Sequence, residues 1–521
     1  MLKRIITLLL ALLMLVGTLS LFSCGLFSKK DPETTSADGD SDVVDTSSID
    51  GTESEEESEE ESEEEDNTDY SILLDVPDDL NYGGKEIVIL GYDSSVNEFA
   101  DKSLTGIVDK ALVNRDSYIE QYLNVKLKLV KEKGQFNDVS DYSQKAITSI
   151  STGQQAYDII CAYSMTPSIL TLQGVLYDLA DESFDNGGDN YIDLSKVWWP
   201  QYLIENLSVN GKTYSVSGDA ATTLMYNLML VMFDANMLNK YHIDAKELYD
   251  AVDNGTWTLD YLLEITKGIS QDNGDNVWDV NDFYAISAES AIPFSGFYFG
   301  TGNRLVENQS GRLVISDTIT SANAIDVFES VFDAVNETHI IRKAEPDHRT
   351  LISSGNCLFE LGTAQQLGSI VAKTESTIGM LPFPKYEEGD TPYYSLLQNT
   401  HSHFCVPNDA KDPSCSSAVL ETMGYASYET VTPVVYENVM KLRYAQDPDS
   451  SRMFDVIRAG AMTDIGILNY FNFVANGAKN PLSIFREAVH SDSKDWVSTV
   501  AGYEKGIKTT LDKMNEFYYL G

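Results

Sequence analysis

The chain has 521 residues, 43% of them hydrophobic, and a formal net charge of −45 at pH 7. This negative charge disfavours nucleic acid or an anionic lipid surface as a partner. The part that follows residue 69 is longer than one ordinary domain and predicts two or three.

Residues 1–23 have the layout of a secretory signal, because a basic start precedes an apolar run over 5–22. That run also approaches the length of a helix that crosses a bilayer. It ends in "LFSC", which resembles the lipobox of bacterial lipoproteins. The resemblance implies that Cys24 carries lipid such as palmitate, on the outer face of the membrane of a Gram-positive-type bacterium. An uncleaved anchor helix and a plain secreted protein are the alternatives.

An acidic segment follows this cysteine. Residues 31–69 contain "ESEEESEEESEEED" and, in all, nineteen Asp or Glu residues without any Lys or Arg. Such a composition cannot bury enough apolar surface to offset the entropy of ordering, so we expect disorder. Residues 24–69 are therefore predicted to form a lipidated, extended tether. A calcium buffer and a protein-docking tail are the other interpretations.

The folded part begins with alternating strand and helix patterns. "KEIVIL" at 85–90, "VKLKLVK" and "GQQAYDIICAY" read as strands, and 105–123 and 141–150 between them read as helices. This order predicts an α/β layer with a parallel sheet. Helix patterns dominate over 219–275, strands return in "NCLFELG" and "STIGMLPFP", and 415–521 is mostly helical. The order suggests two lobes between which the chain crosses more than once.

The remaining cysteines match no zinc spacing. They are Cys161, Cys357, Cys405 and Cys415. Cys161 and Cys357 lie in apolar strand-like runs, so we expect inert core thiols there, with one disulfide among the cysteines as the alternative on an oxidising cell exterior.

One acidic loop, "QDNGDNVWDVND", has oxygen ligands at calcium-loop positions. Asn273, Asp275, Asp279 and Asp282 occupy positions 3, 5, 9 and 12, and the carbonyl of Val277 falls at position 7. Positions 1 and 6 hold Gln and Asn, where the motif has Asp and Gly. A structural calcium site and a solvated acidic turn both remain open, and no other cofactor is expected.

No catalytic motif stands out. The chain contains no HExxH, GxSxG or GxxxxGK[ST] sequence, so we expect a protein that is not an enzyme. Abundant carboxylates keep a glycosidase pair as an alternative. His401 and His403 alternate on one strand face without a third ligand nearby, and polar strand residues are the preferred interpretation.

A resemblance covers roughly residues 84–515. "GKTYSVSGDAATTLMYNLMLVMFDANMLNKYHI" is similar to the interlobe region of extracellular solute-binding proteins of ABC importers, the maltose-binding type included. "LYDAVDNGTWTLDYLLEITKGI", "LISSGNCLFELGT" with "TIGMLPFPK", and "KLRYAQDPDSSRMFDVIRAG" follow in the family's order. The resemblance implies an α/β, two-lobed periplasmic-binding-protein type II fold with an interlobe ligand cleft. It implies an N-lobe from 84–220 and 341–403, and a C-lobe from 221–340 and 404–521.

The family resemblance also implies a function. A monomer would capture a carbohydrate, an oligosaccharide in particular, by lobe closure and deliver it to the membrane subunits of a permease. Sugars stack on aromatic rings and form hydrogen bonds to polar side chains, so such residues after strands or in loops are the candidates. They are Tyr92, Asp93, Tyr163, Ser164, Trp199, Asp219, Trp257, Tyr298, Glu360 and Thr363. Plain packing is the alternative for each aromatic residue. A surface-anchored glycoside hydrolase and a binder of a non-sugar solute such as a peptide are the rival functions.

Overall fold

The computed structural model describes residues 72–94, 96–101, 103–185, 188–343 and 350–520. They belong to one compact unit, Thr68–Gly521. The predicted signal, the lipidated Cys24 and the tether lie outside the described residues. Within these ranges, no helix is long and apolar enough to cross a membrane.

The first sheet is mostly parallel, as the sequence predicts. Its strands are β1 (Lys85–Tyr92), β2 (Val125–Glu132), β3 (Ile159–Tyr163) and β13 (Ser402–Cys405). They lie in the order β13-β3-β1-β2. Strand β1 is parallel to both of its neighbours, β2 and β3, whereas β13 is antiparallel to β3. The helices α2 (Ile107–Tyr122) and α3 (Val139–Ser151) provide the crossovers that parallel strands require.

The second sheet is mixed. Its strands are β6 (Met229–Asp234), β7 (Tyr284–Ala288), β10 (Cys357–Thr363) and β11 (Ile378–Leu381). They lie in the order β11-β6-β10-β7, in which β10 is antiparallel to β6 and parallel to β7. Every residue of these four strands is buried, which explains why the strands are mostly apolar.

This pairing corrects one predicted boundary. We expected 341–403 to return to the first lobe, but its strands β10 and β11 pair with β6. Of the strands that the structure describes in this range, only β13 rejoins the first sheet. The prediction was wrong because an apolar run identifies a strand without identifying its partner.

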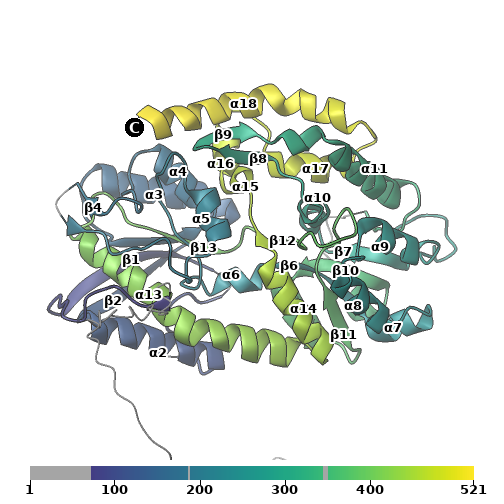
Figure 1. Cartoon of the computed structure of the whole chain (residues 1–521), viewed down its shortest axis with the longest axis horizontal. Helices are drawn as coiled ribbons and strands as arrows, with labels where there is room; N and C mark the ends of the chain where they lie inside the picture. Colours follow the sequence, from purple (N-terminus) through teal and green to yellow (C-terminus); the bar gives the residue numbers. More distant parts are fainter. Residues whose placement is uncertain (1–71, 95, 102, 186–187, 344–349, 521) are drawn as a thin grey trace, which may run out of the picture. The chain divides into compact units, whose positions relative to one another are not determined.

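Helices surround both sheets (Figure 1). With the first sheet lie η2 (Phe136–Asp138), α4 (Thr166–Leu172), β4 (Ser183–Phe184), β5 (Gly188–Asp189), α5 (Gln201–Leu207) and α13 (Pro413–Pro433). With the second lie α7 (Ala235–Lys240), α8 (Ala245–Asp253), α9 (Leu259–Thr266), η3 (Ile292–Phe294), α10 (Ser295–Gly300), α11 (Ala322–Asn336), η5 (Ile352–Ser354), α12 (Ala364–Val371) and α14 (Pro448–Ala459). Further along are β8 (Val306–Gln309), β9 (Arg312–Ile315), η4 (Asp317–Thr320), α15 (Ile465–Leu468), α16 (Tyr470–Ala475), α17 (Pro481–Val489) and α18 (Trp496–Leu520).

The chain passes between the two sheets three times. The first crossing, 217–228, contains α6 (Thr223–Tyr226) and leads into β6. The second crossing, 397–401, leads into β13, and isolated bridges at both ends hold it beside the first. The third is the π-helix η6 (Val434–Tyr444), between α13, which packs on α2, and α14, which packs on β11. A short pair, β12 (Ser395–Leu396) with β14 (Ala461–Met462), adjoins these crossings.

Candidate functional site

The carboxyl ends of strands from both sheets adjoin the crossings. Ser402 begins β13 and lies opposite Tyr163, the last residue of β3. Met229 begins β6 and lies opposite Thr363, the last residue of β10. Because Ser402 and Met229 directly follow crossing segments, both strand-end edges flank the same junction. Ligands of open α/β sheets bind outside such edges, so this junction is the first candidate for a binding cleft.

In the first lobe, three predicted residues contact the second crossing or Ser402, the strand residue directly after it. The hydroxyls of Tyr92 and Ser402 form a hydrogen bond of 3.1 Å. The side-chain amide of Asn399 donates to the hydroxyl of Tyr163. The Ser164 hydroxyl donates to the Asn399 carbonyl at 2.6 Å. Tyr92, Tyr163 and Ser164 are buried in this arrangement. They lie at the predicted edge and fix the second crossing to it.

Polar groups at the same edges are more accessible. Asp93 is exposed directly after β1, and its carboxylate accepts the backbone N–H of Gly134 at 3.0 Å. Thr363 and Gln366 form a capping box that starts α12. Glu289 follows β7, is half-buried and makes no hydrogen bond or ion pair within the described ranges. The sequence analysis missed Glu289, although a carboxylate directly after the buried run "YAISA" could have indicated a polar group at a strand end.

Elements of the second lobe face this edge from across the junction. Helices α15 and α17 pack with β8, α10 and α11, and α16 contacts α4 of the first lobe. The Asn472 amide donates to the Ser168 carbonyl at 3.1 Å. The ring centroid of Phe136 lies 5.2 Å from that of Tyr470 and 5.3 Å from that of Phe471. The lobes therefore touch here. Sequence reasoning missed these aromatic residues because their contact joins distant segments.

A buried carboxylate ties the first two crossings together. Glu98 accepts the backbone N–H of Thr222 at 2.6 Å and the hydroxyls of Thr223 and Ser402 at 2.5 Å each. Burial raises the pKa of Glu98, and these hydrogen bonds together with the charge of Arg115 oppose that rise. The arrangement fixes the two crossings to the loop that follows β1.

Three predicted aromatic residues are core residues. Each is fully buried and has its polar atom satisfied inside the protein. The indole N–H of Trp199 donates to Glu421 at 2.9 Å, and that of Trp257 donates to the Pro382 carbonyl at 2.9 Å. The Tyr298 hydroxyl donates to the backbone carbonyl of Arg304 at 3.1 Å. These contacts correct the expectation that Trp199, Trp257 and Tyr298 bind ligand, because aromatic composition does not distinguish a core from a cleft.

Glu360 is also structural. It lies inside β10, is 1% exposed and accepts the backbone N–H groups of Leu351 and Ile352 at 3.1 and 3.4 Å. Burial raises the pKa of Glu360 to about 7. We expected it at the strand end, but β10 continues to Thr363.

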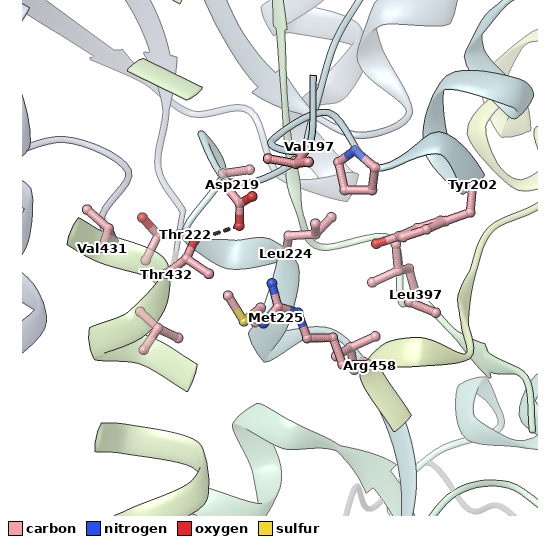
Figure 2. Close-up of a pocket in the computed structure, with 16 residues that line it drawn as sticks. Val197, Tyr202, Asp219, Thr222, Leu224, Met225, Leu397, Val431, Thr432 and Arg458 are labelled. Carbon is pink, nitrogen blue, oxygen red and sulfur yellow. Dashed lines mark hydrogen bonds between the residues drawn. The ribbon is translucent and has the colours of Figure 1, made fainter. Parts of the chain in front are cut away.

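Asp219 lines a separate cavity of about 190 Å³ against the crossings (Figure 2). The Thr432 hydroxyl donates to its carboxylate at 2.6 Å. Burial raises the pKa of Asp219 to about 6, opposed by this hydrogen bond and by the charge of Arg458. None of the strand-end residues lines this cavity.

Side chains of the acidic loop accept hydrogen bonds from the loop's own backbone N–H groups. Asp282 is 1% exposed and accepts the backbone N–H of Asn273 at 2.8 Å and that of Asp279 at 2.6 Å. The backbone N–H groups of Asp275 and Val277 are each bonded to the side chain two residues before them. The part of the chain that the structure describes contains no group of three or more His, Cys, Asp or Glu side chains suited to a metal. Calcium binding through Asn and carbonyl oxygens stays a prediction.

The histidines and cysteines are interior groups. His401 and His403 face each other with 3.1 Å between their Nε2 atoms. Burial lowers the pKa of His401 to about 4 and holds that of His403 well below its usual value, so both are neutral at pH 7 and one donates to the other. The four described cysteines are free and buried, which confirms the prediction of core thiols for Cys161 and Cys357.

Solved structures share this fold. The chain superposes on UspC of M. tuberculosis with a TM-score of 0.53 at 12% identity, covering 83% of this chain and 100% of that one. The cyclic α-maltosyl-1,6-maltose binding protein of Arthrobacter globiformis gives 0.53 at 13% identity, with 84% and 100% covered. An extracellular solute-binding protein of Staphylococcus aureus in complex with maltose gives 0.54 at 10% identity, with 82% and 98% covered. No family model and no curated protein matches by sequence. The likeness confirms the expected two-lobed α/β fold.

Proposed function

We propose that the protein is the extracellular solute-binding component of an ABC importer and captures a carbohydrate between its lobes. The observation that carries the proposal is the convergence of the strand ends of both sheets on the crossing segments. The solved structures with this fold, among them one in complex with maltose and one with maltotetraose, support a sugar as the ligand class.

The groups at the junction suit a hydroxylated ligand. Asp93 and Glu289 offer carboxylate acceptors from opposite lobes, and sugar hydroxyls are donors that such groups bind well. Phe136, Tyr470 and Phe471 offer ring faces for the apolar side of a pyranose. Because these rings already touch across the lobes, the contact has to part before a ligand enters. Closing around the ligand would then re-form it.

Calorimetric titration of the purified protein with maltose and longer maltodextrins tests this proposal. We expect saturable binding without release of shorter sugars. Glu289→Ala should weaken binding about ten-fold, since it removes a hydrogen bond from a charged acceptor to the ligand. Glu264→Ala, at an exposed site on α9, is the matched control and should leave binding unchanged. Product formation would instead indicate the rival glycoside hydrolase, and binding by no carbohydrate in a broad screen would contradict the proposal.

We further propose that lipid on Cys24 anchors the protein to the outer face of the cell membrane. The acidic segment 31–69 would act as a tether that lets the folded part reach the permease. Cys24→Ala should release the protein into the medium or misplace it, with carbohydrate affinity unchanged. Firm membrane attachment of that variant would favour an uncleaved anchor helix.

A further inference from the structure

The cavity in Figure 2 has walls that belong to the crossings. Its apolar lining includes Leu224, Met225 and Leu228 from the first crossing, Leu397 from the second, Val431 from the end of α13 and Val435 from the third. Its volume is about 190 Å³. An apolar cavity of roughly 150 Å³ in another protein binds benzene, so this one has room for a slightly larger molecule.

One end of the cavity is polar and incompletely satisfied. The Thr432 hydroxyl is committed to Asp219, at 2.6 Å. The Thr222 side chain also lines the cavity, is 4% exposed, and has a hydroxyl with no hydrogen-bond partner in the described residues. A buried hydroxyl without a partner costs free energy, so such groups normally have a protein, water or ligand partner.

The charges at the cavity balance. Asp219 contributes a carboxylate, and Arg458 contributes a guanidinium that also lies 4.6 Å from the ring centroid of Tyr436. A cationic ligand would be repelled by Arg458 and an anionic one by Asp219. The walls away from Asp219 are largely apolar, so a ligand with hydroxyls all round would bury several without partners.

We propose that this cavity is a second binding site, for a small uncharged molecule with an apolar body and a single hydroxyl group. The ligand hydroxyl would donate to the Asp219 carboxylate and accept from the Thr222 hydroxyl, while the apolar body fills the space between Leu224, Leu397 and Val435. The strand-end residues do not line the cavity. The site is therefore distinct from the proposed carbohydrate cleft.

Benzyl alcohol and toluene, a pair that differs by one hydroxymethyl group, are suitable probes for titration of the purified protein. We expect benzyl alcohol to bind more tightly than toluene. Thr222→Val preserves the shape of the side chain and should weaken benzyl alcohol about five-fold while leaving toluene unchanged. Thr222→Ser should retain benzyl alcohol binding.

A cavity-filling variant locates the binding. Ala461→Leu adds volume inside the cavity and should abolish binding of both probes, while Ala459→Leu, at an exposed position on the preceding helix, is the matched control and should not. Thermal melts verify that each variant is folded. Three results would overturn the proposal: no binding of benzyl alcohol by the unmodified protein, unchanged binding by a folded Ala461→Leu variant, or tighter binding of glucose than of benzyl alcohol at this site.

Discussion

Glu421 should make the folded protein less stable in mildly alkaline solution than in mildly acidic solution. It lies on α13, is fully buried and accepts the indole N–H of Trp199 at 2.9 Å and the backbone N–H of Asp193 at 3.3 Å. Burial raises the pKa of Glu421 from 4.5 to about 8, and these two hydrogen bonds oppose the rise only in part. The folded state therefore holds this proton over a pH range in which the unfolded chain has lost it.

The size of the effect follows from proton linkage. Because the folded-state pKa is the higher one, the contribution of Glu421 to stability is complete below the unfolded-state pKa and is lost as pH rises through the folded-state value. Between pH 5.5 and pH 8.5, pKa values of 4.5 and about 8 predict a loss of about 3 kcal/mol from this residue. Glu360, Asp219 and Asp464 also have raised pKa values and add to the slope in the same direction.

Urea denaturation at the two pH values measures this contribution. Glu421→Gln keeps an acceptor for Trp199 but cannot ionise, so the difference in unfolding free energy between pH 5.5 and pH 8.5 should shrink by about 3 kcal/mol. Glu504→Gln, at an exposed site on α18, is the control and should behave as the unmodified protein. If Glu421→Gln keeps the full pH dependence, Glu421 is ionised in the folded state and the reasoning fails.

Three other outcomes follow from buried groups. Trp257→Ala should lower the free energy of unfolding by about 3–5 kcal/mol because it leaves a cavity, and thermal or urea denaturation measures this loss. Unchanged stability with weakened sugar binding would instead indicate that Trp257 contacts the ligand. Asp282→Ala should cost about 2 kcal/mol in the presence of a chelator, because two backbone N–H groups lose their acceptor. A cost that appears only with added calcium would mean that the loop is held by the ion. A thiol reagent should label none of the four described cysteines in the native protein and all four after unfolding, and fewer after unfolding would reveal a disulfide.

Three of the four strands in the first sheet were predictable because the information for them is local, whereas β13 joins β3 from a distant part of the chain. Apolar runs and helical spacing between 85 and 163 identify β1, β2, β3 and the helices that connect them, and a strand–helix–strand order dictates parallel pairing. The second sheet was not predictable in the same way. Strand β10 pairs with β6 across a long stretch of chain, and nothing within "NCLFELG" distinguishes one sheet from the other.

Prediction of the candidate-site residues from the sequence was limited in the same way. Strand ends were placed well enough to find Asp93 and Ser164, which directly follow β1 and β3, and Thr363, the last residue of β10. Glu360 was misplaced by three residues, and that error moves a side chain from the edge of a sheet into its interior. Glu289 was missed. Whether such a side chain belongs to the site depends on its burial in the folded molecule. Burial depends on contacts with segments that a short sequence window does not contain.

The crossings differ from an ordinary hinge of exposed loops because polar side chains join them to one another. Glu98 links the first crossing to Ser402 at the end of the second, the Asn227 amide donates to the Thr400 carbonyl at 3.0 Å, and Thr432 reaches Asp219 from the helix that leads into the third. Buried hydrogen bonds are directional, so sliding one crossing past another would break several at once and leave buried groups unpaired. The Ser217 hydroxyl adds a further link, since it donates to the Ser402 carbonyl at 2.6 Å, so rotation of the lobes on closure would have to be absorbed toward the π-helix η6. The wide turns of a π-helix are often found at functional positions. Substitution of a proline into η6, which has none between Val434 and Tyr444, should then change the rate of ligand capture more than it changes the unfolding free energy of the first lobe, whereas a purely structural third crossing predicts the reverse.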